Sequence, residues 1–193
     1  MRTASVARKT KETDIEVMMN LDGSGLADIQ TGVGFFDHML TALSVHSGID
    51  LTVRVKGDLA VDCHHTIEDA GIVLGTALKK ALETSAPIER YGSAYVPMDE
   101  ALGFAALDVS GRPFLVFQCE FAADRIGDMD TQMAEEFFRA FAFQAGVTLH
   151  LRAEYGKNDH HKAEALFKAL AHSLKQALAL RPGRQLLSTK GVL

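Results

Sequence analysis

The chain contains no tryptophan, only two cysteines and only four prolines among its 193 residues. Cys63 and Cys119 do not form a Cys-x-x-Cys motif, so we expect no structural disulfide and a reduced, cytoplasmic protein. No apolar run approaches the about 18 residues that a transmembrane helix requires. The residues after Met1 also lack the apolar core of a secretory signal. We therefore expect neither a membrane span nor a secretory leader.

Positive charge is also in short supply. The 20 lysines and arginines are outnumbered by 25 aspartates and glutamates, which leaves a formal net charge of −5. A protein of this charge has no basic footprint for nucleic acid, so we expect no nucleic-acid partner. Any anionic substrate must be held by local positive groups. The hydrophobic content of 47% is sufficient for a core, and the length suits one domain or two closely packed halves.

Histidine, by contrast, is concentrated in one repeated motif. The pentad His-His-x-x-Glu occurs at residues 64–68 and again at 160–164, 96 residues further on, and uses four of the eight histidines. Imidazole and carboxylate groups together are ligands for divalent transition metals. The repetition predicts two equivalent metal sites made by two similar halves.

The similarity between the halves extends beyond the pentads. Upstream of them the offset becomes 98, which aligns Gly48 with Gly146 and places His38 opposite Glu136. We infer two fused copies of one unit, about 1–88 and 89–193, within a single domain. Downstream of the pentads, at the offset of 96, Leu74, Leu78, Lys79, Ala81 and Leu82 correspond to Leu170, Leu174, Lys175, Ala177 and Leu178.

Hydrophobic periodicity predicts an α+β protein. Strands and helices follow one another in the same order in each half, which argues against a parallel α/β sheet. The segment Asp22–Gly25 predicts a hairpin turn with residues 26–31 as the return strand, and Asp130 is a candidate helix cap. We expect strands at about 15–21, 26–31, 51–56, 91–96, 103–109, 114–121 and 147–152, and helices at about 35–45, 64–83, 130–145 and 160–180.

At the start of a helix, the pentad would place either histidine on the same face as its glutamate, since these pairs are three or four residues apart. Adjacent histidines point about 100° apart on a helix, so they would bind two different ions. Each ion could then take one histidine from one pentad and a histidine–glutamate pair from the other. The alternative is a solvated helix N-terminus with capping carboxylates.

Two further candidate ligands lie on the helix that precedes each pentad. His38 and Glu136 occupy equivalent positions, and both side chains can bind a metal. His150 competes with Glu136, because the end of a strand could deliver it to the site, although Arg54 stands opposite it in the first half. The chain has no His-Glu-x-x-His motif and no Walker loop, which argues against a zincin protease and a P-loop nucleotidase.

Seven segments carry a resemblance to a known family. They are Arg-Lys-Thr-Lys-Glu-Thr at 8–13, Gly-Phe-Phe-Asp-His-Met-Leu at 34–40, Asp-Cys-His-His-Thr-Ile-Glu-Asp at 62–69, Val-Pro-Met-Asp-Glu-Ala at 96–101, Glu-Glu-Phe-Phe at 135–138, Asn-Asp-His-His-Lys-Ala-Glu at 158–164 and Ser-Thr-Lys-Gly-Val-Leu at 188–193. Over essentially its whole length the chain resembles the imidazoleglycerol-phosphate dehydratase family. In some relatives a histidine stands in place of Glu136.

The resemblance implies a fold and a reaction. The fold would be α+β, with four helices packed between two four-stranded mixed sheets. The reaction would remove water from imidazole glycerol phosphate to give imidazole acetol phosphate in histidine biosynthesis. Each active site would contain two divalent metal ions, for which we expect Mn²⁺. Members form homo-oligomers of about 24 subunits with sites at subunit interfaces. The chain has no room for the phosphatase domain fused in some relatives, so we expect a monofunctional enzyme.

The resemblance also implies residue roles, although it leaves the role of Asp99 open. Glu12 would be the catalytic acid and base, reaching into a neighbouring subunit's site. The metal ligands would be His38, His64, His65, Glu68, Glu136, His160, His161 and Glu164. The substrate, through its phosphate for the most part, would be bound by Glu12, His46, Arg90, Arg112, Lys168, Ser188, Thr189 and Lys190.

Two other functions stay open at this point. A metal-storage shell would need the ligands but not Arg90, Arg112 or the 188–190 segment. A dinuclear hydrolase would release inorganic phosphate from a phosphoester rather than form a ketone.

Overall fold

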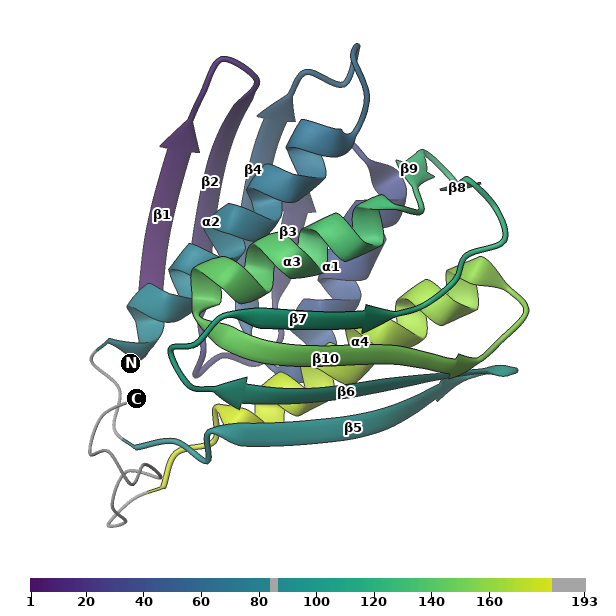
Figure 1. The fold of residues 1–193 in the computed structure, drawn as a ribbon. Coiled ribbons are helices and arrows are strands. Elements are labelled where there is room, and N and C mark those ends of the chain that lie inside the picture. The colour runs from purple at the N-terminus through teal and green to yellow at the C-terminus, as the bar shows by residue number, and fades with distance from the viewer. Residues whose placement is uncertain (84–86, 182–193) are drawn as a thin grey trace.

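The computed structural model describes residues 1–83 and 87–181 of the protein (Figure 1). The first half contains β1 (Thr3–Lys9), β2 (Thr13–Asn20), β3 (Ala27–Gln30), α1 (Gly34–Ser47), β4 (Asp50–Gly57) and α2 (His64–Leu82). The second half contains β5 (Tyr91–Met98), β6 (Ala101–Val109), β7 (Phe114–Gln118), β8 (Arg125–Ile126), β9 (Met129–Asp130), α3 (Met133–Ala145), β10 (Val147–Tyr155) and α4 (Asp159–Ala177).

The two large sheets share one topology. Their strand orders are β1-β2-β4-β3 and β5-β6-β10-β7, and the short β8-β9 hairpin stands apart. In each sheet the first two pairings are antiparallel and the last is parallel, with Ala27 opposite Leu51 and Phe114 opposite Thr148. The four helices lie between the sheets (Figure 1). The expected α+β fold with two mixed sheets is therefore confirmed.

The helices pack across the two halves rather than within them. Helix α2 lies along α3, and α1 lies along α4. Three fully buried rings connect these pairs: Phe137 of α3 contacts Phe36 of α1 and Phe167 of α4, with ring centroids 5.2 and 5.3 Å apart. The halves thus share one continuous core.

Glycines permit two features of this packing. Helices α1 and α3 end at equivalent glycines in the left-handed conformation, Gly48 (φ 79°) and Gly146 (φ 68°), which suits residues without a Cβ. On α2, a Cβ at Gly71 or Gly75 would lie only 2.8 or 2.5 Å from a carbonyl oxygen of α3. The α2–α3 crossing is close because α2 has no side chains at these positions.

The predicted hairpin of residues 15–31 was wrong. Strand β2 pairs with β1 and β4, so both of its edges are occupied, and β3 pairs in parallel with β4 instead. The Asp50 carboxylate at the start of β4 accepts the backbone N–H groups of Ser24, Gly25 and Leu26, and so holds the preceding loop against β4. Strand β1 was not predicted at all, since Val6 is the one apolar residue buried from it.

The predicted helix cap at Asp130 was also wrong. Asp130 belongs to β9, where its carboxylate accepts a 2.6 Å hydrogen bond from Nε of Arg125, and α3 begins only at Met133. Arg125 lies directly opposite Asp130 in the β8-β9 pairing, so the Asp130 carboxylate binds Arg125 instead of capping a helix. No helix among residues 1–83 and 87–181 is both long and apolar enough to cross a membrane.

Candidate active site

Both pentads open a helix, as their spacing predicts. A side-chain oxygen two residues before each first histidine accepts a backbone N–H that the helix leaves free. The Oδ1 of Asp62 accepts from the N–H of His64 at 2.7 Å. At the matching place, Oδ1 of Asn158 accepts from the N–H groups of His160 and His161 at 2.9 and 3.4 Å. Asn158 is the N-cap of α4, and Asp62 stands one residue before the N-cap of α2, Cys63, so a polar side chain marks where each helix begins.

Three candidate ligands converge at the start of α4. His38, from α1, joins His160 and Glu164, and one ligand atom of each lies within 4.8 Å of the others. The Glu164 Oε2 atom is 3.1 Å from Nε2 of His160 and 3.4 Å from Nε2 of His38. We call these three residues the His38 cluster. In the described part of the chain it is the one group of three or more such ligands this close together.

The charge at the centre of the His38 cluster is negative. The Glu164 side chain is buried, and burial by itself would raise its pKa. Lys168, with Nζ 2.6 Å from Oε1, acts with His38 and His160 to outweigh burial, so the pKa of Glu164 lies below its usual range. A carboxylate kept ionised beside two imidazoles is a donor set suited to a divalent cation.

The equivalent place at the start of α2 is more open. The Nε2 of His64 lies 3.5 Å from Oε2 of Glu68, and both side chains are about two-fifths exposed (45% and 41%). We call these two residues the His64 pair. Glu136, the counterpart of His38, has its carboxylate 3.7 Å from Nε of Arg139 on its own helix. Its role as a ligand stays a prediction.

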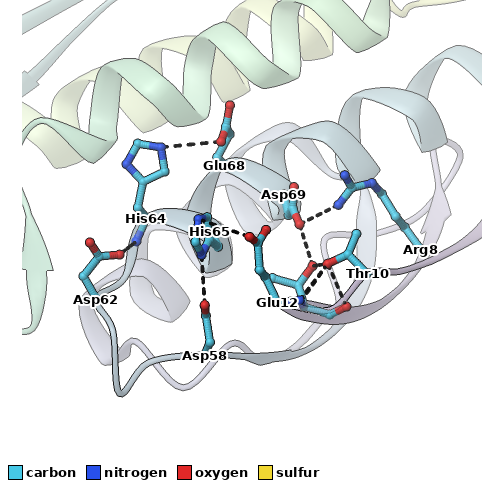
Figure 2. Close-up of polar contacts among 10 residues, drawn as sticks. Arg8, Thr10, Glu12, Asp58, Asp62, His64, His65, Glu68 and Asp69 are labelled. Atoms are coloured by element: carbon cyan, nitrogen blue, oxygen red, sulfur yellow. Dashed lines mark hydrogen bonds and ion pairs between the residues drawn. The ribbon is translucent and has the colours of Figure 1, made fainter.

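The second histidine of each pentad faces different partners from the first. The Nδ1 of His65 lies 3.0 Å from Asp58, and its Nε2 lies 3.8 Å from Glu12 (Figure 2). The Nδ1 of His161 lies 2.7 Å from Glu100. Adjacent rings within the pentads are inclined at 74° and 79°. We call His65 and His161 the outer histidines, because their rings diverge from those of His64 and His160.

The carboxylates shift the protonation of the outer histidines. The hydrogen bond to Asp58 raises the pKa of His65, and the hydrogen bond to Glu100 raises the pKa of His161. Glu100 is itself perturbed: the backbone N–H of Asn158, then the His161 ring, lower its pKa to about 2. It is thus ionised at any pH at which the fold is expected to persist.

The β1–β2 turn brings Glu12 to the site (Figure 2). Within the turn, Oγ1 of Thr10 accepts the backbone N–H groups of Glu12 and Thr13 at 3.1 and 3.0 Å. Asp69 on α2 accepts from the Thr13 hydroxyl and pairs with Arg8, each at 2.5 Å. The turn is therefore tied to the pentad helix, while the Glu12 side chain stays 53% exposed.

Two predicted phosphate-binding arginines converge on Asp108. The Arg90 guanidinium is buried and makes two hydrogen bonds to the Asp108 carboxylate, at 2.7 and 3.1 Å, and Nη2 of Arg112 lies 3.5 Å from the same group. Lys168 lies apart from them, on Glu164. The other three predicted groups, Ser188, Thr189 and Lys190, lie outside the described residues.

The structure also places two remaining histidines. The Nδ1 of His46 on α1 is 3.3 Å from Nε2 of His172 on α4, and burial lowers the pKa of His46, which favours its neutral form. His150 is exposed between the buried residues Leu149 and Leu151, so it lies on the face of its sheet away from the helices. This face does not carry the pentads, and His150 is a poor candidate ligand.

Besides Asp58 and Asp62, three acids in these contacts were not singled out for the site from sequence. Asp69 holds the Glu12 turn, Asp108 holds two arginines, and Glu100 contacts His161 although 61 residues separate them. Glu100 and Asp69 lie within the family motifs at 96–101 and 62–69, and these motifs were the available signal. Spacing along the chain gives none, because these partners come from different strands and turns.

Fold and site together define a class of protein. It is a duplicated α+β protein in which histidine–carboxylate groups lie at the N-terminal ends of two helices.

Comparison with known proteins makes the class specific. Residues 31–174 match the family model for imidazoleglycerol-phosphate dehydratase. The imidazoleglycerol-phosphate dehydratase of Nitrobacter hamburgensis is 56% identical and covers 100% of this chain and 99% of its own, and that of Listeria welshimeri is 55% identical and covers 100% of both. The Staphylococcus aureus enzyme structure has a TM-score of 0.85 at 37% identity over 93% of this chain and 99% of its own. The Pyrococcus furiosus structure scores 0.84 at 35% identity over 97% and 100%. The chain belongs to the imidazoleglycerol-phosphate dehydratase family of hydro-lyases.

Proposed function

We propose that this protein catalyses the metal-dependent dehydration of imidazole glycerol phosphate to imidazole acetol phosphate, a step of histidine biosynthesis, in the cytoplasm. The observation that carries the proposal is the His38 cluster, in which a carboxylate kept ionised meets two imidazoles from helices of opposite halves. The family supports the reaction, since relatives of matching length carry the dehydratase name.

The donor set suits two divalent ions per active site, and we propose Mn²⁺. His38, His160 and Glu164 would hold one ion, and the His64 pair with Glu136 would contribute to a second. Mixed imidazole and carboxylate ligands accept Mn²⁺ among several divalent metals. When bound, the ions would stabilise negative charge on the substrate imidazole as Lewis acids.

The outer histidines support a site shared between subunits. Each contacts a different carboxylate from the one beside the first histidine of its own pentad, and among the described residues no group of three or more close ligands includes side chains from both pentads. We propose that His65 and His161 complete clusters of neighbouring chains in a homo-oligomer of about 24 subunits, as closed symmetric assembly allows.

Glu12 is our candidate for the proton transfers. Dehydration requires departure of the hydroxyl beside the imidazole ring, loss of a proton from the neighbouring carbon, and conversion of the resulting enol to the ketone. A half-exposed carboxylate on an anchored turn beside His65 can accept and return such protons. It contacts its own chain's His65, whether or not it also reaches a neighbouring subunit.

The substrate phosphate requires cations, and we propose Arg90 and Arg112 for it. Arginine makes forked hydrogen bonds to phosphate oxygens. The Arg112 side chain is 63% exposed, so it can turn from Asp108 toward a ligand. Lys168, His46 and the Ser188, Thr189 and Lys190 segment complete the proposed set.

The test combines metal analysis of the purified protein with a dehydratase assay before and after chelation. We expect bound divalent metal, loss of ketone formation on chelation, and recovery with Mn²⁺. Metal binding without turnover would favour storage, and release of inorganic phosphate would favour a hydrolase. Glu12→Gln should lower kcat by about 10²–10⁴-fold with Mn²⁺ binding retained. The matched control is Glu16→Gln, an exposed position on β2, which should leave turnover unchanged.

A further inference from the structure

Both outer histidines direct the same ring nitrogen at a carboxylate. The Nδ1 of His65 is 3.0 Å from Asp58, and the Nδ1 of His161 is 2.7 Å from Glu100. A carboxylate can only accept, so each contact favours a ring proton on Nδ1. The Nε2 atoms lie further from an acid, 3.8 Å from Glu12 in His65 and 3.6 Å from Asp99 in His161, and in the neutral ring they keep their lone pair. Imidazoles that bind metals generally have their second nitrogen held in this way.

Glu100 is itself fixed by the backbone. Its Oε1 accepts the N–H groups of Lys157 and Asn158 at 2.9 and 2.7 Å, while Oε2 faces His161. The same side chain therefore positions the segment that caps α4 and the ring that this helix presents. Asp58 lies at the start of the turn between β4 and α2, where its carbonyl accepts the N–H of Val61 at 2.7 Å.

The two carboxylates do not correspond to each other in the repeat. At the offset of 96 the counterpart of Asp58 is Glu154, whose carboxylate contacts Arg152 at 2.7 Å. Glu100 comes instead from the β5–β6 turn, in the place where the first half has the β1–β2 turn with Glu12. The same Nδ1 contact is thus built twice from different elements, which simple duplication of the sequence does not explain.

We propose that Asp58 and Glu100 are positioning residues that hold His65 and His161 in the tautomer and ring orientation for binding a metal through Nε2. This inference rests on the metal-dependent function proposed above. Neither acid is needed as a ligand in that role. Each acts through the imidazole it contacts.

Removing each acceptor tests the proposal on the full-length protein. In Glu100→Gln the amide oxygen can still accept from Lys157 and Asn158, but the NH₂ group cannot accept from Nδ1–H. His161 must then move its proton to Nε2 or turn away. Both oxygens of Asp58 lie near Nδ1 of His65, at 3.2 and 3.0 Å, so an amide could still accept there, and Asp58→Leu is used instead. We expect Mn²⁺ affinity, measured by titration of the metal-free protein with detection of free Mn²⁺ by electron paramagnetic resonance, to fall about 10–100-fold in each variant.

Two controls remove the same charge without touching a ring. Asp62→Asn keeps the oxygen that accepts the His64 N–H, and Glu154→Gln changes an acid that faces Arg152. Both should bind Mn²⁺ as the wild type does, which would separate ring positioning from a general loss of negative charge. Asp58→Glu, which retains an acceptor, should bind Mn²⁺ more tightly than Asp58→Leu.

Three outcomes would count against the inference. Wild-type Mn²⁺ affinity in Asp58→Leu and Glu100→Gln would overturn it while leaving the proposed function intact. Weaker Mn²⁺ binding together with a lowered thermal midpoint of the metal-free variant would show instead that the acid stabilises the fold. A wild-type protein that binds no Mn²⁺ would overturn the proposed function and this inference together.

Discussion

The two pentads stand at equivalent places in the fold, yet their surroundings differ. Glu164 is 8% exposed and is held by Lys168, whereas Glu68 is 41% exposed and has Ile72 at the position corresponding to Lys168. The result is an assembled His38 cluster on α4 and an open pair on α2. A repeated backbone therefore sets where candidate ligands lie, and a few side chains one turn away decide how closely they gather.

The residues through which α2 and α4 pack against α3 also differ between the two halves. Where α2 has Gly71 and Gly75, α4 has Phe167 and Ala171. The glycines allow α3 to approach the α2 backbone, and Phe167 fills the space between α4 and the aromatic side chains of α3. One half gains contact by bringing backbones together, and the other by burying a ring.

The largest effect should come from removing that ring. Phe167→Ala would leave a cavity against Phe137 and Phe138, whose ring centroids lie 5.3 and 4.7 Å from it. We expect a loss of about 3–5 kcal/mol in the free energy of unfolding, measured by denaturant titration of metal-free protein at fixed concentration. A loss below about 1 kcal/mol would show that the core closes around the gap.

Adding a methyl group to the other helix should also destabilise the protein, though less. The Cβ of Gly75→Ala would meet the Phe141 carbonyl oxygen at 2.5 Å and the Ala145 nitrogen at 2.9 Å, so α2 and α3 must separate. Overpacking of this kind costs about 1–3 kcal/mol. The reverse change, Ala171→Gly on α4, should cost about 1 kcal/mol through helix propensity alone. A stabilised Gly75→Ala variant in the same denaturant titration would contradict the close crossing.

The loops that precede β3 and β7, which are held by residues of β4 and β10, offer a contrast in pH dependence. Asp50 accepts three backbone N–H groups, with those of Leu26 and Ser24 lowering its pKa most, whereas Thr148 donates its hydroxyl to the Arg112 carbonyl at 2.9 Å. Asp50→Asn should cost about 1 kcal/mol at neutral pH.

The sign of this pH effect follows from the lowered pKa. The contribution of the Asp50 charge is complete above its ordinary pKa of about 4 and is lost as pH falls through the lower folded value. Unfolding measured at pH 6 and below pH 4 should therefore show the difference between wild type and Asp50→Asn shrinking in acid. The difference in free energy of unfolding between wild type and Thr148→Val should not change with pH. If it shrinks in acid as much as the Asp50→Asn difference does, the charge of Asp50 is not the cause.

The smallest effect concerns the open side of the site. Arg139 contacts Glu136, where the corresponding position in α1 is Thr41. An exposed ion pair of this kind is worth about 0.2–1 kcal/mol, so Arg139→Ala should tighten Mn²⁺ binding by no more than about fivefold. Arg139→Lys, which keeps the charge, is the control. Weaker binding in Arg139→Ala would argue against Glu136 as a ligand.

Local patterns predicted the elements of this fold better than their partners. Period-two and helical spacing located β2, β4 and all four long helices, and the pentads open α2 and α4 because capping and i,i+4 contacts are local. The partner of β3 was missed, since it depends on how Asp50 holds a loop 24–26 residues away in sequence. Periodicity carries no information on such long-range choices.

The candidate site divides in the same way. The contact between His160 and Glu164 follows from their spacing, but the approach of His38 requires α1 to pack on α4 across the halves. Alignment of the repeats placed His38 opposite Glu136 without indicating what either would touch. The contact of Glu100 with His161 likewise depends on a turn reaching a helix from a separate hairpin.

The packing of helices across the two halves also limits what a fragment of the protein can form. The His38 cluster draws on α1 from one repeat and α4 from the other. A fragment holding a single repeat would retain a pentad but not the helix that faces it, and two fragments would have to reassociate to rebuild the group. An ancestor of half this length could have possessed the cluster only as a pair of identical chains, each lending a helix to the other.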